Sequence, residues 1–150
     1  MSVTITRDSL QQILAELTGQ DVKAEQASDI TPHPATYRGL VTPENKLVAV
    51  IASDLNFAHR CGAALAMIPA TAVEDDAEEV EDHLIEFYGE VANVLSRLAN
   101  EAYAEHLRLD PGFDIPAEVL QKIIDNGTMT IGANTTIDPH GSGAVGIWFA

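Results

Sequence analysis

The proline-free stretch from about residue 77 to 107 constrains the fold of this chain more than any other feature. It includes DAEEVEDHLIEFYGEVANVLSRLANEAYAEHL, which is rich in strong helix formers such as alanine, leucine and glutamate. The acidic run at residues 74–82 favours the positive end of a helix dipole. The sequence therefore predicts one long helix at about 77–107, with a solvated acidic start.

Side chains on this helix divide into a polar and an apolar face. At about 100° per residue, four polar residues fall within about 60° of one another and are called the polar row: Glu86, Glu90, Asn93 and Arg97. The opposite side carries apolar residues that we expect to face the core: Leu84, Tyr88, Val91, Leu95, Leu98 and Ala102. Gly89 lies beside the polar row in a helix interior, where glycine costs roughly 1 kcal/mol relative to alanine. The polar row is either an ordinary solvated face or a site that a partner approaches closely.

Caps and apolar spacing predict three shorter helices. The first covers about residues 7–17 and is capped by Thr6 or Asp8. A second begins after Asp54, a good N-cap, and breaks before Pro69. A third follows as AEVLQKIIDNG.

Strand-like runs are predicted on either side of two turns. ATYRGLVTPENKLVAVIAS holds two such runs around TPEN, where Pro43 presets the turn and Asn45 tolerates it. TMTIGANTTI and GAVGIWFA flank the turn DPHGSG. Because there is no internal repeat and no long linker, we expect a single domain over residues 1–150. Its predicted class is α+β, an α/β sandwich in which helices pack on an antiparallel or mixed sheet.

The charge of the chain excludes several classes of partner. With 23 acidic and 8 basic side chains, its net charge of -15 would repel nucleic acid and anionic membranes and favours basic partners. Cys61 is the one cysteine, so it cannot form an internal disulfide, and the N-terminus lacks the features of a signal peptide. No apolar run reaches the roughly 18 to 20 residues that span a bilayer. We therefore expect a cytoplasmic protein that binds neither nucleic acid nor membrane.

Other chemistries find little support in the sequence. The five histidines show no metal-ligand spacing, and His59 with Cys61 is too sparse for a zinc site. Cys61 lies in an apolar helix and is expected to be a small core residue rather than a nucleophile. The glycines of GANTTIDPHGSGAVG fit a hairpin turn better than a phosphate loop, because no lysine follows them.

The polar row belongs to a longer pattern. Three residues separate Glu86 from Glu90, two separate Glu90 from Asn93, and 22 separate Asn93 from Pro116. This spacing resembles the signature of the CheX/CheC/FliY response-regulator phosphatases: aspartate or serine, then glutamate, asparagine and proline at the same intervals. GEVANVLS is also similar to the family's glycine-glutamate-x-x-asparagine phrase. Glu86 departs from the signature, because it stands where the family has aspartate or serine. Since no second Glu-x-x-Asn occurs, the resemblance is closest to the single-site CheX type.

The resemblance implies a CheX-like fold and a phosphatase that hydrolyses the aspartyl phosphate of a CheY-like receiver domain. Asn93 would orient the attacking water, and Glu90 would dock on the regulator's active-site lysine. Magnesium would belong to the regulator, so the chain would need no cofactor of its own. Glu86 would support the site, Gly89 is inferred to allow close approach, and Pro116 would shape the chain after the helix. The resemblance also implies a homodimer. The alternative is a noncatalytic CheX-like binding or dimerisation module in two-component or chemotaxis signalling.

Overall fold

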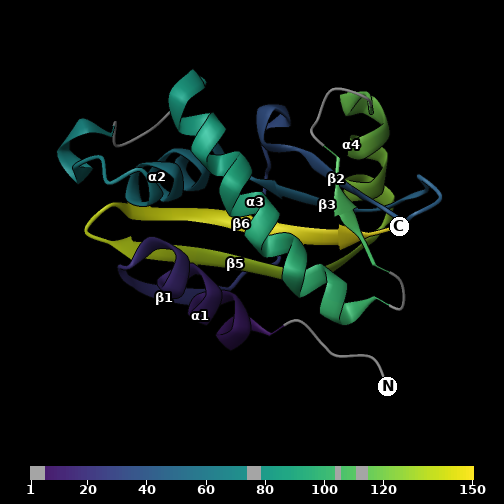
Figure 1. The fold of residues 1–150 in the computed structure, drawn as a ribbon, viewed down its shortest axis with the longest axis horizontal. Coiled ribbons are helices and arrows are strands. Elements are labelled where there is room, and N and C mark those ends of the chain that lie inside the picture. The colour runs from purple at the N-terminus through teal and green to yellow at the C-terminus, as the bar shows by residue number, and fades with distance from the viewer. Residues whose placement is uncertain (1–5, 74–78, 104–105, 111–114) are drawn as a thin grey trace.

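The computed structural model describes residues 6–73, 79–103, 106–110 and 115–150, which form a six-stranded sheet with helices on both faces (Figure 1). The strand order is β1-β5-β6-β3-β2-β4, and every neighbouring pair is antiparallel. The strands are β1 (Asp21–Gln26), β2 (Arg38–Val41), β3 (Leu47–Ser53), β4 (Arg108–Leu109), β5 (Thr128–Asp138) and β6 (Gly141–Phe149). The predicted α+β class, a sheet packed by helices, is confirmed.

Both predicted hairpins are present. β2 and β3 pair around the TPEN turn, where Asn45 adopts a φ of 64°. Asparagine tolerates this left-handed conformation better than most residues do. β5 and β6 form the second hairpin, with Thr128 opposite Phe149 and Ile137 opposite Gly141.

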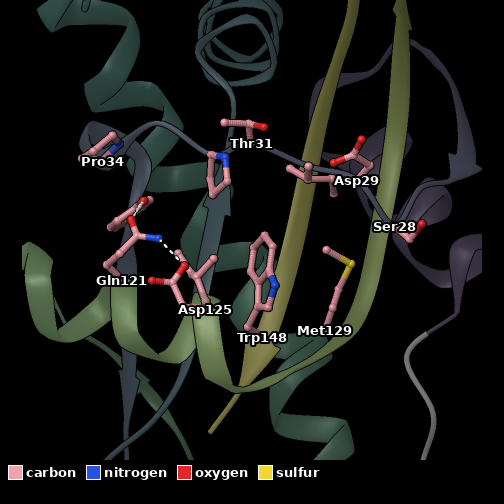
Figure 2. A pocket seen from close by; sticks show the side chains of 12 residues that line it. Ser28, Asp29, Thr31, Pro34, Gln121, Asp125, Met129 and Trp148 are labelled. Carbon is pink, nitrogen blue, oxygen red and sulfur yellow. Dashed lines mark hydrogen bonds between the residues drawn. The ribbon is translucent and has the colours of Figure 1, made fainter.

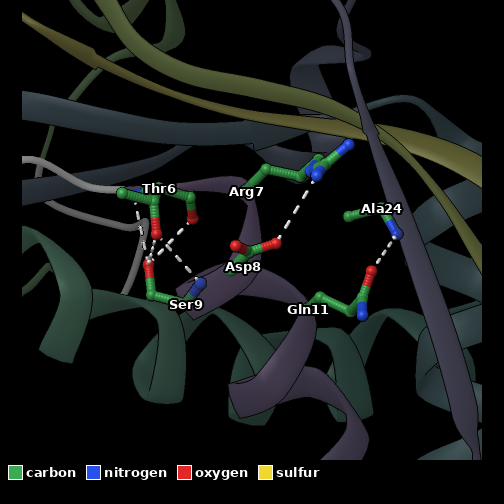
Figure 3. Close-up of polar contacts among 6 residues, drawn as sticks. All are labelled: Thr6, Arg7, Asp8, Ser9, Gln11 and Ala24. Carbon is green, nitrogen blue, oxygen red and sulfur yellow. Dashed lines mark hydrogen bonds and ion pairs between the residues drawn. The ribbon is translucent and has the colours of Figure 1, made fainter.

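The three predicted short helices are also present: α1 (Arg7–Thr18), α2 (Leu55–Leu65) and α4 (Ala117–Asn126). Thr6 caps α1, because the Ser9 N–H donates to its Oγ1 at 3.1 Å and its own N–H donates to the Ser9 Oγ at 3.1 Å (Figure 3). Asp54 caps α2 and accepts the Phe57 N–H through Oδ1 at 2.7 Å. Each cap satisfies N–H groups that lack a partner inside the helix, which fixes where the helix begins. Two single 3-10 turns are η1 (Pro34–Thr36) and η2 (Ala70–Ala72).

The long helix α3 covers Asp82–Ala102 and is shorter than predicted. The bounds of 77–107 are wrong at residues 79–81, 103 and 106–107, which are not helical, while 77, 78, 104 and 105 lie outside the described residues. At the start, the Glu81 N–H donates to the buried His59 Nε2 at 3.2 Å. At the end, the Asn100 Nδ2 donates to the Leu107 carbonyl oxygen at 3.0 Å. Side-chain contacts therefore accompany both ends of a segment whose composition favours a longer helix.

β1 is an edge strand that no pattern in the sequence predicts. Its residues DVKAEQ are mostly exposed and only Ala24 is buried, so no apolar alternation marks the strand. The Ala27 N–H donates to the Gly132 carbonyl oxygen of β5 at 2.8 Å. Because main-chain groups alternate in direction along an antiparallel strand, those of Ala24, three residues earlier, point away from β5. The Gln11 Oε1 of α1 accepts the Ala24 N–H at 2.9 Å (Figure 3). This side chain covers part of the open edge.

Different helices cover the two faces of the sheet (Figure 1). On β3, Ala49 and Ile51 belong to a core shared with α1, α2 and α3. Val50 and Ala52 belong to a second core shared with α4. This alternation follows the two-residue period of a strand. The exposed side of α3 and the helix α4 therefore lie on opposite sides of the sheet.

Candidate functional site on the long helix

The polar row is exposed along one uninterrupted helix. Glu86, Glu90, Asn93 and Arg97 are all exposed residues of α3. On the opposite face, five residues are each no more than 5% accessible: Leu84, Tyr88, Val91, Leu95 and Leu98. The division into a polar and an apolar face follows the prediction from helical spacing.

Tyr88 fixes the middle of α3 beneath the polar row. Its hydroxyl is buried and donates to the Thr36 carbonyl oxygen at 2.9 Å. Its ring meets Phe57 edge-on with centroids 6.3 Å apart, and the Arg38 guanidinium lies 5.4 Å from its centroid. Burial raises the pKa of Tyr88 to about 12, so the hydroxyl remains a donor. These contacts hold the backbone just before Glu90 in place.

The start of α3 packs closely on α2. A Cβ at Gly62 would lie 2.5 Å from the Leu84 carbonyl oxygen, which is too close for a carbon atom. Glycine at this position therefore lets the two helices approach each other. His59, which accepts the Glu81 N–H, also has a structural role at this contact.

Glu90 and Asn93 lie one turn apart with their side chains available. The Ser96 Oγ donates to the Asn93 backbone carbonyl oxygen at 2.5 Å, and this hydrogen bond does not involve the Asn93 side-chain amide. Within the described residues, no hydrogen bond or ion pair involves the Glu90 carboxylate or the Asn93 amide. A neutral amide offers one acceptor and two donors, whereas a carboxylate offers charged acceptors. The pair can orient a water molecule and hold a cationic side chain next to each other.

The remaining predicted residues divide between this row and a distant position. Glu86 and Arg97 flank the pair on α3, and Gly89 lies beside it in open space, since an added Cβ would meet no atom within 4 Å. Pro116 is instead the exposed N-cap residue of α4, and its carbonyl oxygen accepts the Val119 N–H at 3.0 Å. Because α4 packs against the other face of the sheet, Pro116 does not join the polar row.

The structure also describes Cys61, the candidate metal ligands and the apolar helices. Cys61 is fully buried, and burial raises the pKa of its thiol to about 12, so it is a core residue, as predicted. Among the described residues, no group of three histidine, cysteine, aspartate or glutamate side chains is placed to hold a metal ion. No helix in the same ranges is long and apolar enough to cross a membrane.

Solved structures share this fold at low sequence identity. No protein-family model and no curated protein matches the chain. A chain of the FliM–SpeE complex from H. pylori has a TM-score of 0.62 at 12% identity, over 95% of this chain and 80% of that one. FliY from Thermotoga maritima has a TM-score of 0.59 at 12% identity, over 98% and 85%. The chemotaxis protein CheX from Vibrio vulnificus has a TM-score of 0.50 at 13% identity, over 95% and 92%. The chain therefore has the fold of the FliM middle domain, FliY and CheX, and the predicted resemblance is confirmed at the level of the fold.

Proposed function

We propose that this protein is a phosphatase that hydrolyses the aspartyl phosphate of a CheY-like receiver domain. One observation carries the proposal: Glu90 and Asn93 lie one turn apart, exposed and without side-chain partners among the described residues. Tyr88 fixes the helix beneath them, so the pair is presented on a rigid element. The fold shared with CheX supports the same assignment.

Asn93 is assigned to the attacking water. An aspartyl phosphate is a mixed anhydride, and its hydrolysis needs a water molecule in line with the bond that breaks. The amide oxygen of Asn93 can accept a hydrogen bond from that water while its nitrogen donates to a neighbouring oxygen. Because the amide is neutral, it does not repel the phosphoryl group. Aligning one water is worth roughly 1.4 to 4 kcal/mol, which corresponds to about a tenfold to thousandfold rate increase.

Glu90 is assigned to docking on the receiver. Its carboxylate lies one turn before Asn93 and would pair with the receiver's active-site lysine. Such an ion pair contributes little to the free energy of binding while water surrounds it, and more once the complex excludes water. Magnesium would be held by the receiver, so this chain supplies only docking and water orientation.

The test is the decay of phosphate from receiver domains of the same genome after phosphorylation by a small-molecule donor. The wild type should accelerate the decay of at least one receiver. Asn93→Ala should bind that receiver without accelerating decay, and Glu90→Gln should bind it more weakly. Asn126→Ala and Glu118→Gln change exposed residues of α4 and serve as matched controls that should behave as the wild type. If the wild type leaves the decay of every receiver unchanged, the phosphatase assignment fails.

A second candidate is a noncatalytic module that binds a signalling partner. Chains from the FliM–SpeE and FliG–FliM complexes have TM-scores of 0.62 and 0.60, above the 0.50 of CheX. In those structures FliM is assembled with SpeE or FliG. Glu86, which departs from the phosphatase signature, favours the same candidate. Binding of phosphorylated receivers with no effect on their decay would select it.

We also propose that two copies of the chain pair through their sheets. β1 is the longer outer strand, because β4 at the other edge has only two residues. The outer side of β1 presents main-chain groups that a second strand could pair with, although Gln11 already holds the Ala24 N–H. The mass of the protein in solution tests this pairing.

A further inference from the structure

A cavity of about 550 Å³ opens on the sheet face that α4 covers (Figure 2). It lies between α4 and the segment 28–34, on the side of the sheet opposite the polar row. Its volume is within the range of about 300–1,000 Å³ that is typical of small-molecule sites. Neither the sequence pattern nor the proposed phosphatase activity accounts for it.

The wall formed by segment 28–34 is tied to the sheet at both ends. The Ala27 N–H donates to the Gly132 carbonyl oxygen of β5 at 2.8 Å. The His33 N–H donates to the Ser53 carbonyl oxygen of β3 at 2.9 Å. A wall held in this way does not have to be ordered when a ligand binds, which lowers the entropic cost of binding.

Trp148 of β6 and Met129 of β5 form the floor, with Tyr37 beside them. Trp148 is 4% accessible, so packing fixes its ring, and it lines the cavity. Figure 2 shows no hydrogen bond from the indole nitrogen to any other residue drawn. The floor offers apolar surface and an aromatic ring, both of which suit the stem of an organic cation.

The two walls carry negative charge. Asp29 stands on one side of the cavity and Asp125 on the other, with Trp148 between them (Figure 2). None of the lining residues, all of which the structure describes, is a lysine, arginine or histidine. An anion would be repelled here, and an uncharged ligand without hydrogen-bond donors would displace water from the carboxylates without replacing its hydrogen bonds.

Asp125 is oriented by a chain of hydrogen bonds. The Tyr37 hydroxyl donates to the Gln121 Oε1, and the Gln121 Nε2 donates to the Asp125 Oδ1 at 2.9 Å. Burial, and then the charge of Asp125, raise the pKa of Tyr37 above its usual 10.0, so the hydroxyl stays protonated and continues to donate. Within the described residues, no hydrogen bond involves the second carboxylate oxygen of Asp125, which can accept from a ligand.

We infer that this cavity binds a guanidinium or ammonium group carried on a short apolar stem. Asp29 and Asp125 hold the charge, while Trp148 and Met129 contact the stem. The cation is either a free small amine or the basic side chain of a partner protein. Since the cavity and the polar row lie on opposite sides of the sheet, the inference does not depend on the phosphatase assignment.

The fluorescence of Trp148, which is the one tryptophan of the chain, reports binding directly. The full chain is titrated with butylguanidinium and with its neutral isostere butylurea at constant ionic strength. Butylguanidinium should give a saturable change and bind at least about fivefold more tightly than butylurea, because it alone pairs with the carboxylates. Equal binding of the two compounds, or no saturable change with either, would overturn the inference.

Variants of the carboxylates provide the second arm. Asp29→Asn and Asp125→Asn should each weaken butylguanidinium binding by about two- to fivefold, and added salt should weaken wild-type binding in the same direction. The double variant should lose the preference for the cation. Glu118→Gln removes an exposed charge from α4 outside the cavity and should leave binding unchanged. A double variant that melts like the wild type and keeps the preference would contradict the inference, as would an equal loss in Glu118→Gln.

Two peptides distinguish the sources of the cation. An acetylated and amidated Gly-Gly-Arg-Gly-Gly is compared with the same peptide carrying neutral citrulline. Tighter binding of the arginine peptide than of butylguanidinium supports a partner side chain, whereas equal or weaker binding supports a free amine. Equal binding of the citrulline and arginine peptides would count against cation recognition from either source.

Discussion

Replacing Gly89 by alanine separates the stability of α3 from its proposed role in docking. Gly89 lies inside the helix, beside Glu90, and an added Cβ would meet no atom within 4 Å. The substitution therefore adds a methyl group without a clash in the free protein. It also places that methyl group on the surface that a receiver would approach.

The expected gain in stability follows from helix propensity alone. Alanine is favoured over glycine in a helix interior by about 0.8–1 kcal/mol, mainly because the unfolded chain loses freedom. For a chain of 150 residues, this gain raises the melting temperature by about 2–4 °C. Thermal unfolding followed by circular dichroism measures the shift.

Gly62→Ala is the matched control, because Gly62 is also interior to a helix. Its Cβ would lie 2.5 Å from the Leu84 carbonyl oxygen, so α2 and α3 would have to move apart. We expect a loss of about 1–3 kcal/mol instead of a gain. A lower or unchanged melting temperature for Gly89→Ala, or a higher one for Gly62→Ala, would refute the argument from local space.

The same Gly89→Ala protein tests whether a receiver domain closely approaches α3 at Gly89. If a receiver backbone passes over Gly89, the methyl group displaces it, and the acceleration of phosphate decay should fall by at least about tenfold, since a misplacement of about 1 Å can cost a hundredfold. Decay at the wild-type rate would remove Gly89 from the docking surface and leave the assignments of Glu90 and Asn93 intact.

Three further predictions concern the core and the sheet edge. Tyr88→Phe leaves the buried Thr36 carbonyl oxygen without its donor, so chemical denaturation should show a loss of about 1–3 kcal/mol; an unchanged curve would contradict this. Burial raises the thiol pKa of Cys61 from 9.0 to about 12. The protonated thiol therefore contributes to the free energy of unfolding below pH 9, and this contribution is lost as the pH rises toward 12. A thiol reagent should accordingly label Cys61 only as the chain unfolds, and rapid labelling of the folded protein would be the contrary result. Gln11→Ala frees the Ala24 N–H at the outer edge of β1 and should strengthen self-association in sedimentation, whereas weaker association would argue against pairing through β1.

The elements that sequence predicts best are those with a local cause. Thr6 and Asp54 begin helices because their side chains accept from the helix's own N–H groups. Asn45 turns the first hairpin because it tolerates a positive φ. The two faces of α3 follow from the 3.6-residue period, so the exposure of Glu90 and Asn93 is predictable without a structure.

The elements that sequence predicts poorly depend on distant parts of the chain. β1 pairs on one side only and buries only Ala24, so its residues carry no strand period. The start of α3 depends on His59, which is 22 positions before Glu81 in the sequence. The role of Gly62 depends on a carbonyl of the next helix. The cavity beside α4 is lined by segments around Asp29, Asp125 and Trp148, which lie far apart in the sequence, and no local pattern connects them.

Asn93 is proposed to orient the water that attacks the aspartyl phosphate. The most direct measurement is the rate constant for phosphate loss from a phosphorylated receiver at saturating concentrations of the wild type and of Asn93→Ala. Because Asn93 is exposed and its side chain has no partner among the described residues, the variant should fold and bind as the wild type does. The rate constant of Asn93→Ala should be lower by about tenfold to a thousandfold, with unchanged affinity for the receiver. Equal rate constants at saturation, both above the receiver's own decay, would contradict it.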